Sequence, residues 1–266
     1  MTSATRYATD YTVDELVVAA IAHSIRDGEL VQQGGGTALG IVAVLLARLT
    51  HAPNLKYNYL ASVDPQFDSL GDPGHSALAV AGTSLMPFTI DQMVSMCLRG
   101  KTDVFGTMPA QIDRYGNVNV SLIGEHQRPD VRFPGGYGIT DWFLYAGRVF
   151  AYVPRHTTRS FVEQVDYVTG TGHLPGGLQE RQRLGIPGRG PERVFSNLAV
   201  MSFDDESGLM RLESLHPGVT LAEVEANTGF DLPAAEDVGE TQPPTEEEIA
   251  LIRDHIDPRG LRRHRF

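Results

Sequence analysis

Apolar residues recur at helical spacing behind threonines in several parts of the chain. Thr12 stands three residues before Glu15, and the same Thr-x-x-Glu/Gln spacing begins at Thr89, Thr220 and Thr245. In this arrangement the threonine accepts a hydrogen bond from a backbone N–H of the first helical turn. The Glu or Gln side chain accepts one in return from the backbone N–H of the threonine. The pattern therefore predicts four helices that begin directly after these threonines.

Short apolar or β-branched runs lie between the helices and predict strands. These runs cover residues 30–32, 55–60, 104–105, 118–122, 149–153, 194–203 and 210–215. Strands that alternate with helices favour an α/β fold with a mostly parallel sheet and flanking helices. The length of 266 residues predicts a single domain over residues 1–266. The acidic, proline-bearing segment 233–244 predicts an exposed linker to a C-terminal helix, together covering about 233–258.

The charge balance excludes one class of protein. The net charge of -11 is opposite to that of a duplex-binding surface, so no nucleic-acid partner is expected. Basic side chains gather only near the C-terminus, at Arg259, Arg262, Arg263, His264 and Arg265. This cluster predicts a solvated tail, with phosphate binding as the alternative.

The cysteine usage and the apolar runs indicate the compartment. Cys97 is the one cysteine, so no disulfide forms within the chain, and a reducing compartment is expected. Cys97 is interpreted as a buried helix residue, with a catalytic thiol as the alternative. The longest apolar stretch, residues 41–49, is too short to cross a membrane, and residues 1–10 lack a signal-peptide core. We therefore expect a cytoplasmic protein that has no membrane partner.

Candidate chemistry is sparse when the residues are taken one motif at a time. No metal-ligand spacing occurs, so no metal site is predicted. Gly34, Gly35 and Gly36 follow a predicted strand and precede a helix, where a phosphate could bind, but no complete dinucleotide fingerprint is present. The glycine- and proline-rich stretches 106–140 and 155–191 are long enough to predict functional loops. Motif by motif, the sequence thus indicates only an α/β enzyme or binding protein.

Several segments taken together carry a resemblance to a known family. Gln111–Asn119 reads Gln-Ile-Asp-Arg-Tyr-Gly-Asn-Val-Asn, and Arg132–Gly138 reads Arg-Phe-Pro-Gly-Gly-Tyr-Gly. Further segments follow in order at 161–169, 180–188, 228–231 and 256–258. These segments resemble the β subunit of family I CoA-transferases of the glutaconate CoA-transferase branch. The resemblance covers roughly Tyr11 to Pro258.

The resemblance implies a fold, a partner and a substrate class. It implies the family I CoA-transferase fold, which is NagB/RpiA-like, and a homologous α subunit with which this chain forms an α2β2 complex. The substrate is implied to be an acyl-CoA thioester. No separate cofactor is expected, because CoA is part of the substrate.

Two family features that carry chemistry are altered here. The family's Gly-x-Gly-x-Pro loop, whose backbone amides form an oxyanion hole, corresponds to Gly36, Thr37, Ala38, Leu39 and Gly40. Here alanine replaces the second glycine and glycine replaces the proline. Backbone donors survive such changes, because an oxyanion hole needs N–H groups and not particular side chains. The second feature is the nucleophile.

Leucine replaces the family's catalytic glutamate. Leu60, Ala61 and Ser62 stand where the family has Glu-Ser-Gly, and no glutamate occurs between Glu29 and Glu125. A CoA-transferase carries the acyl group and then CoA on a carboxylate, and leucine cannot form either bond. Asp64 is the nearest following carboxylate, about 13 Å away along an extended strand.

Among relatives that lack the glutamate, the chain resembles the β subunit of hydrolases that cleave a carbon–carbon bond in a cyclic keto acyl-CoA during steroid (cholesterol C/D ring) catabolism. This further resemblance implies a general base from the α subunit and leaves no catalytic residue identified in this chain. The chain supplies a substrate-lining wall. The residues expected there from family position are Gly36, Thr37, Ala38, Leu60, Ser62, Gly135, Gly136, Tyr137 and Gly138.

Alternatives remain at this point. Tyr137 is either a packing residue or a substrate-lining, proton-donating one. The chain is either the hydrolase subunit, a CoA-transferase subunit with a displaced carboxylate such as Asp64, or a non-catalytic partner that completes the α subunit.

Overall fold

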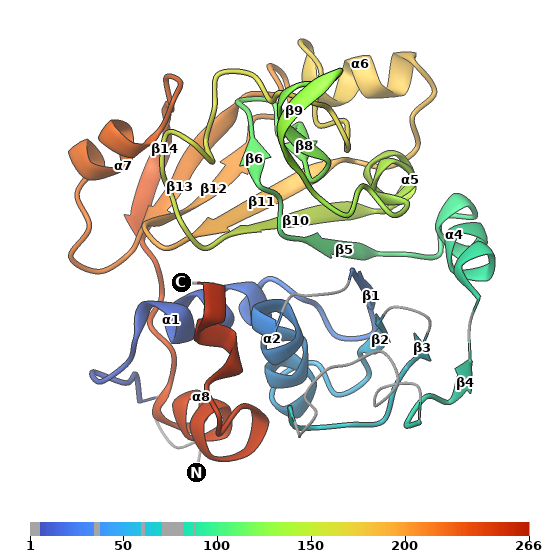
Figure 1. The fold of residues 1–266 in the computed structure, drawn as a ribbon. Coiled ribbons are helices and arrows are strands. Elements are labelled where there is room, and N and C mark those ends of the chain that lie inside the picture. The colour runs from blue at the N-terminus through green and yellow to red at the C-terminus, as the bar shows by residue number, and fades with distance from the viewer. Residues whose placement is uncertain (1–5, 35–37, 60–61, 71–81, 88, 266) are drawn as a thin grey trace. The chain divides into compact units, whose positions relative to one another are not determined.

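The contacts within the chain form two compact units. The structure is a computed structural model that describes residues 6–34, 38–59, 62–70, 82–87 and 89–265. Unit 1 comprises Met1–Ile90 and Gln242–Phe266, and unit 2 comprises Asp91–Thr241. Each unit combines strands with helices, which confirms the predicted α/β class with a mixed, mostly parallel sheet (Figure 1). The single domain over the whole chain stays a prediction.

A β–α–β motif forms the centre of unit 1. β1 (Leu30–Gln33) leads through α2 (Ala38–Leu49) to β2 (Lys56–Tyr59), which pairs with β1 in parallel. β3 (Ser62–Val63) and β4 (Met86–Pro87) add antiparallel strands. Residues 39–47 of α2 are all buried, because one side of the helix faces the strands and another faces its neighbouring helices.

The remaining helices of unit 1 come from both ends of the chain. α1 (Val13–His23) packs on α2. α8 (Glu246–Ala250) continues into the π-helical turn η1 (Leu251–Ile256), and the 3₁₀ turn η2 (Leu261–Arg265) follows. The helices predicted after the first and last threonines are therefore confirmed. Their cap N–H groups donate to glutamates in the first turn at 2.9 Å in α1 and 2.7 Å in α8.

The larger sheet lies in unit 2. In spatial order it comprises β14 (Ala234–Glu240), β13 (Met210–Leu215), β12 (Ala199–Phe203), β11 (Pro191–Ser196), β10 (Arg148–Val153) and β5 (Val104–Thr107). β5, β10 and β11 are parallel, β12 is antiparallel to both neighbours, and β14 is parallel to β13.

One predicted strand of this sheet was wrong, and one observed strand was not predicted. Residues 194–203 form two strands of a hairpin, because Asn197 and Leu198 separate β11 from β12. The expected linker contains strand β14, whose pairing with β13 overrides its acidic, proline-flanked sequence. The helix expected after it is present as α8 and η1.

The glycine-rich middle of the chain contains two small two-stranded sheets. β6 (Gln111–Ile112) pairs with β7 (Val118–Asn119), and β8 (Leu122–Glu125) pairs with β9 (Arg128–Arg132). The predicted strand 118–122 is thus divided between β7 and β8. Helices of unit 2 are α4 (Ile90–Leu98), α5 (Ile139–Tyr145), α6 (Gly177–Arg183) and α7 (Leu221–Asn227). α4 and α7 begin directly after Thr89 and Thr220, as predicted.

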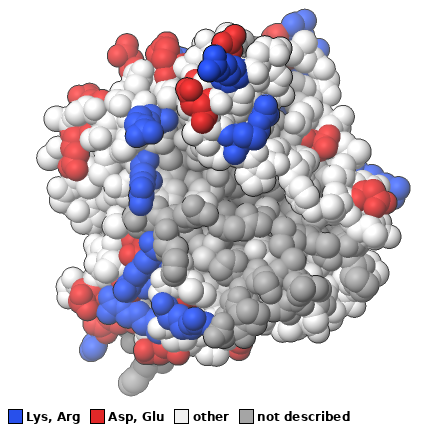
Figure 2. Space-filling model, viewed as in Figure 1, with Lys and Arg blue, Asp and Glu red and all other residues white. Residues whose placement is uncertain are grey.

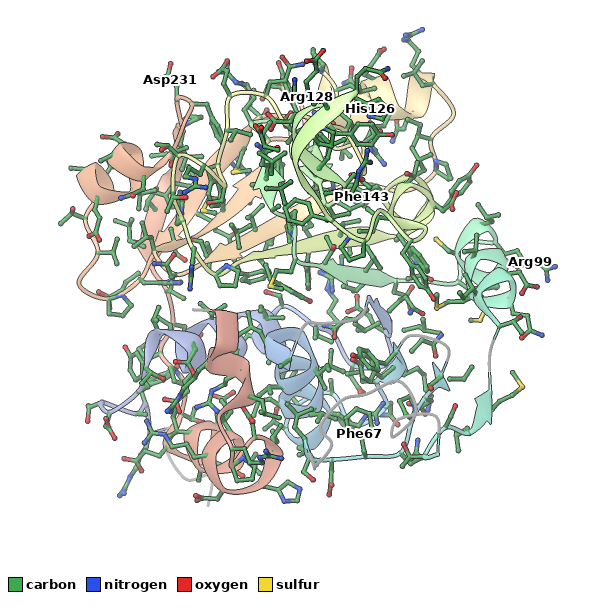
Figure 3. All side chains as sticks on the ribbon, in the orientation of Figure 1. Phe67, Arg99, His126, Arg128, Phe143 and Asp231 are labelled. Carbon is green, nitrogen blue, oxygen red and sulfur yellow. The ribbon has the colours of Figure 1, made fainter. Side chains whose placement is uncertain are left out.

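Aromatic packing fixes α5 and the β8–β9 hairpin in unit 2. Trp142 of α5 stacks on Phe105 of β5 with ring centroids 4.9 Å apart. Phe143 is fully buried near the hairpin, whereas His126 and Arg128 lie toward its tip (Figure 3). The His126 ring stacks on Tyr167 at 5.4 Å, which ties the hairpin to the following loop.

A buried arginine near the C-terminus joins the two segments of unit 1. Arg262 is only 2% exposed. Its guanidinium lies 2.7 Å from Asp14, 2.6 Å from Glu15 and 3.0 Å from Asp257. Arg253 also contacts Glu15, at 2.9 Å. Although burial alone would raise the pKa of Glu15, hydrogen bonds from Arg253 and Thr12 and the charge of Arg262 lower it to about 2. The predicted solvated tail is therefore wrong for Arg262, which is a structural residue.

Charged side chains of both signs share the molecular surface. On the described part of the face drawn in Figure 2, blue and red side chains lie beside one another. Among the residues that the structure describes, no helix is both long enough and apolar enough to span a membrane.

Replacing Arg262 with alanine should destabilise the protein by about 3–5 kcal/mol, because the substitution leaves buried carboxylates without their cation. Urea unfolding of the wild type and Arg262→Ala measures this loss. Arg263→Ala is the matched control. Its side chain is 55% exposed and stands 3.6 Å from Asp14, so the change should cost less than about 1 kcal/mol. Equal losses in the two variants would contradict a structural role specific to Arg262.

Candidate functional site

The segment Gln111–Asn119 folds a tight turn around one carboxylate. Asp113 accepts hydrogen bonds from the backbone N–H groups of Tyr115 and Asn117, each at 3.0 Å, and from the Asn117 amide at 2.9 Å. Gly116 has φ +74°, and a Cβ there would lie 2.7 Å from a ring atom of Phe203. Aspartate, asparagine and glycine are thus required here by the turn itself.

Asn119 connects this turn to neighbouring loops. Its fully buried side chain donates to the Gln111 Oε1 at 2.7 Å and to the Leu122 carbonyl at 2.6 Å, and it accepts from the Ser121 N–H at 2.9 Å. Gln111 also accepts from the Asp166 N–H at 3.0 Å. The segment that first suggested a family is therefore an internal scaffold that holds loops 120–122 and 161–169 together.

The glycine-rich loop 132–138 is held against this scaffold. A Cβ on Gly136 would lie 2.6 Å from the Thr169 methyl group, and a Cβ on Gly138 would lie 2.5 Å from the Trp142 ring. Thr169 in turn hydrogen bonds to Ser121 at 2.8 Å. Close approach of the backbone explains why these positions are glycine.

Tyr137 stands out within this loop. Its φ is +44°, between Gly135 at +106° and Gly138 at +83°. A non-glycine residue in this region costs on the order of 1 kcal/mol, and such positions cluster at functional sites. The Tyr137 side chain is 60% exposed, so it does not pack in the core of this chain. The sequence left two roles open for Tyr137, and this exposure disfavours packing within the chain.

In unit 1, two predicted segments leave the sheet at one edge. β1 and β2 are parallel, with Gln33 opposite Tyr59, so both strands end together. Ligands of open α/β sheets bind at the carboxyl ends of strands. Ala38 begins α2, and Ser62 begins β3 as a buried residue paired with Tyr59. Gly36, Thr37 and Leu60 lie outside the described residues.

The Asp64 carboxylate is bound by the Arg48 side chain and the Tyr57 backbone. β3 turns back along β2, with Asn58 opposite Val63, so Asp64 lies near the middle of β2 and away from its carboxyl end. Its carboxylate is 2.6 Å from the Arg48 guanidinium and accepts from the Tyr57 N–H at 3.2 Å. A carboxylate whose partners are a cation and a backbone donor is a weak nucleophile.

A buried histidine pair has contacts that look catalytic. His156 Nδ1 lies 2.9 Å from the Ser196 hydroxyl, and His156 Nε2 lies 3.0 Å from the Thr228 hydroxyl. His216 Nε2 donates to the Ser196 carbonyl at 2.9 Å. Ser196 is 0% exposed and its hydroxyl also accepts from the backbone N–H groups of Leu198 and Ala199, which indicates a structural role. No motif marks these residues in the sequence, since Ser196 and Thr228 follow His156 by 40 and 72 residues.

Cys97 is buried, as predicted. Burial, followed by the negative charge of Asp141, raises the pKa of its thiol to about 12. The protonated thiol is a poor nucleophile, which argues against the alternative of a catalytic cysteine.

Other polar clusters in the described residues show no reactive arrangement. A cavity of about 140 Å³ in unit 2 is lined by residues that include Arg189, Arg193, Asp205 and Glu213. Arg193 pairs with Glu213 at 2.8 Å, and Arg189 lies 3.6 Å from Asp205. Across the described ranges, no three His, Cys, Asp or Glu side chains are arranged to hold a metal ion.

Comparison with known proteins identifies relatives over nearly the whole chain. A family model described as coenzyme A transferase matches residues 91–227. The B-type subunit of the 3-oxoadipate CoA-transferase of Pseudomonas knackmussii is 34% identical over 250 residues, 91% of this chain and 92% of that protein. The B-type subunit of the glutaconate CoA-transferase of Acidaminococcus fermentans is 32% identical, covering 94% of each chain.

A third relative and a solved structure carry other activities in their names. The cholesterol ring-cleaving hydrolase IpdB subunit of Mycobacterium tuberculosis is 32% identical over 253 residues, 93% of this chain and 96% of that protein. The crystal structure of the decarboxylase AibA/AibB has a chain that superposes with a TM-score of 0.83 at 30% identity. The match covers 95% of this chain and 98% of that one.

Acid should destabilise unit 2 through its buried histidines. Burial lowers the pKa of His156 to about 3, assisted by the charge of His216, and burial lowers that of His216 to about 4. The unfolded chain binds protons near the ordinary value of 6.5, so stability is full above that pH and falls as the pH drops from about 6.5 to 4. Urea midpoints measured between pH 7.5 and 4.5 should show this slope.

His156→Gln should flatten the slope, because it removes one of the two buried imidazoles. A wild-type slope retained in full by His156→Gln would contradict the assignment.

Proposed function

This chain belongs to the coenzyme A transferase family as a subunit of the B type, and from that premise we propose that it works in a hydrolase. The proposed enzyme cleaves a carbon–carbon bond in a cyclic keto acyl-CoA during steroid (cholesterol C/D ring) catabolism. One observation carries the proposal. We place Leu60 at the family's glutamate position from the order of the motifs in the sequence, and the nearest following carboxylate, Asp64, is paired with Arg48.

The proposed reaction needs no covalent enzyme intermediate. A base on the α subunit removes a proton from water, whose oxygen bonds to the ring carbonyl carbon. The carbonyl electron pair moves to its oxygen, and backbone N–H groups around Gly36, Thr37 and Ala38 stabilise this oxyanion. Collapse forms a carboxylate and breaks the adjacent carbon–carbon bond, and the resulting carbanion takes up a proton.

The chain's part in this reaction is to shape the site. From family position, we propose that Leu60, Ser62, Gly135, Gly136, Tyr137 and Gly138 line the substrate. The exposed Tyr137 and the common edge of β1 and β2 support this assignment. CoA enters as part of the substrate, and no separate cofactor is proposed.

The enzyme is proposed to be a cytoplasmic α2β2 complex with a homologous α subunit. Support comes from the relatives, each of which is named as one subunit of an enzyme, and from the two-component name of the decarboxylase. The family's B-type members include transferases at the same level of identity. A CoA-transferase with a displaced carboxylate is therefore the second candidate, and a non-catalytic partner is the third.

The hydrolase and the transferase differ in one measurable species. We expect no covalent CoA adduct on this chain when the co-expressed complex is incubated with an acyl-CoA, because Leu60 cannot form a thioester. Intact-mass spectrometry with and without borohydride checks this. A CoA-sized mass increase that disappears in Asp64→Asn would establish the transferase.

The Tyr137 series tests whether the glycine-rich loop lines the substrate. We expect Tyr137→Phe to keep turnover near the wild-type rate and Tyr137→Ala to lose about 10-fold or more, because the ring defines shape and backbone amides hold the oxyanion. A phenol that donates to the oxyanion would instead cost on the order of 100-fold when removed. Tyr167→Ala, at a 39% exposed tyrosine of the same unit, is the control. Equal rates for wild type and Tyr137→Ala would place this loop outside the site.

A further inference from the structure

A buried arginine lies in a segment that has no part in the proposed reaction. Residues 180–188 carry part of the family resemblance, and within them Arg181 of α6 is only 1% exposed. Among the described residues, no carboxylate pairs with its guanidinium. Burial lowers the pKa of Arg181 to about 10, so the side chain still carries its charge at neutral pH. A buried charge without a counterion is costly, so this arginine needs an explanation beyond packing.

The Arg181 guanidinium joins three backbone segments of unit 2. Its N–H groups donate to the carbonyl oxygens of Gly188 at 3.0 Å, Gly172 at 2.7 Å and Phe143 at 2.6 Å. A guanidinium is planar and has five donors in a fixed arrangement, so it can bind several carbonyls at once in set directions. The ammonium of a lysine is a point charge on a flexible stem and cannot replace it.

Phe143 lies in the last turn of α5, where Figure 3 labels it. The last four carbonyls of a helix lack partners within the helix and carry a partial negative charge. Arg181 binds the Phe143 carbonyl, and the Gly188 N–H donates to the Leu144 carbonyl at 2.8 Å. Carbonyl dipoles thus take the place of a carboxylate counterion, and Arg181 fixes the carboxyl end of α5.

The other end of α5 carries the glycine-rich loop. Gly138 is the N-cap of α5, and the Thr140 hydroxyl in its first turn donates to the Thr169 carbonyl at 2.7 Å. The loop also approaches the Thr169 methyl group closely. Three residues further along the chain, Gly172 is bound by Arg181. One guanidinium therefore holds both of the segments that contact the glycine-rich loop.

Tyr137 has the backbone conformation that such support explains. Its φ of +44° is unfavourable for a residue with a side chain. A strained conformation of this kind persists only where the surrounding structure over-determines it. Here α5, which begins two residues later, and the segment that follows Thr169 supply that constraint.

We infer that Arg181 is a positioning residue for Tyr137 and acts on it through α5 and the segment 169–172. This inference rests on the proposed substrate-lining role of Tyr137. Arg181 is buried within the chain and does not contact the substrate. Its function is to keep the Tyr137 ring at the place where it shapes the site.

Arg181→Lys, made in the complex with the α subunit, keeps the charge and loses the planar fork. We expect kcat to fall by about 10-fold, because a misplacement of about 1 Å can cost on the order of 100-fold. In a Tyr137→Ala background the same substitution should cost less than about 2-fold, since it acts through the ring that is missing there. Effects that multiply in the double variant, or a kcat for Arg181→Lys within about 2-fold of wild type, would overturn the inference.

Two controls separate positioning from loss of stability. Arg183→Lys changes a 68% exposed side chain of the same helix and should leave both kcat and Tm unchanged. Ser196→Ala removes a fully buried, hydrogen-bonded hydroxyl elsewhere in unit 2, so it should lower Tm and leave kcat unchanged. If Arg181→Lys and Ser196→Ala lose kcat in proportion to Tm, Arg181 is merely structural.

Hydrogen exchange tests the same inference without an assay of activity. In Arg181→Lys, peptides that cover residues 132–145 should exchange faster, while peptides of unit 1 exchange as in the wild type. Thr140→Val removes only the hydroxyl that bonds to Thr169, and it should accelerate exchange in the same peptides to a smaller extent. This milder variant decides the matter if Arg181→Lys does not assemble. Exchange that is unchanged, or faster throughout the chain, would contradict the inference.

The assays also separate this inference from the proposed function. Each variant is tested for hydrolysis of a cyclic keto acyl-CoA and for acyl exchange between acetate and a short acyl-CoA. A wild-type complex that only exchanges acyl groups refutes the hydrolase, while the Arg181→Lys ratio in that exchange still decides the role of Arg181. A complex inactive in both reactions refutes the proposed function and, with it, a catalytic effect of Arg181.

Discussion

The contact between Glu15 and Arg262 is the constraint on which unit 1 depends. One carboxylate accepts the cap N–H of α1, pairs with Arg253 and neutralises the buried Arg262. Three roles on one side chain explain why a charged pair is retained where apolar residues would avoid the cost of desolvation. Through it, residues from both ends of the chain enclose α2, and α2 connects the two strands whose carboxyl ends carry the proposed site.

The segments that carry the family resemblance form a scaffold in this chain. Asp113 and Asn119 hold the turn and loops that support the glycine-rich segment, and none of their described contacts involves a group that could react. Such scaffolds host different chemistries, because function resides in the few residues placed on them. The relatives' names, which cover transfer, ring cleavage and decarboxylation, agree with that view. In this chain the proposed function rests on Leu60, on the pairing of Asp64 with Arg48 and on the exposed Tyr137.

Short-range patterns in the sequence predicted the helices and strands whose formation depends on neighbouring residues. Each of the four threonine caps begins a helix, and the strands at 30–32, 104–105 and 149–153 lie inside observed ones, because caps and apolar runs act over a few residues. The acidic strand β14 and the burial of Arg262 were missed, because each depends on partners far away in sequence. For the proposed site, family order suggested the glycine-rich loop, whose substrate-lining role stays a prediction. The contact between the buried residues His156 and Ser196 carries no local signature, because it joins positions 40 residues apart.

The division of the chain between its units has a consequence for synthesis. Unit 2 is one uninterrupted segment, so all the residues of this unit are available before the C-terminal segment of unit 1 is synthesised. Unit 1 is incomplete at that stage, because Arg253, Asp257 and Arg262 emerge only after all of unit 2. Until then Asp14 and Glu15 on the nascent chain lack their cations, and the apolar faces of α1 and α2 lack the helices that cover them. The apolar surface of the early segment therefore stays uncovered until the C-terminal residues are synthesised, and such surface is prone to aggregation.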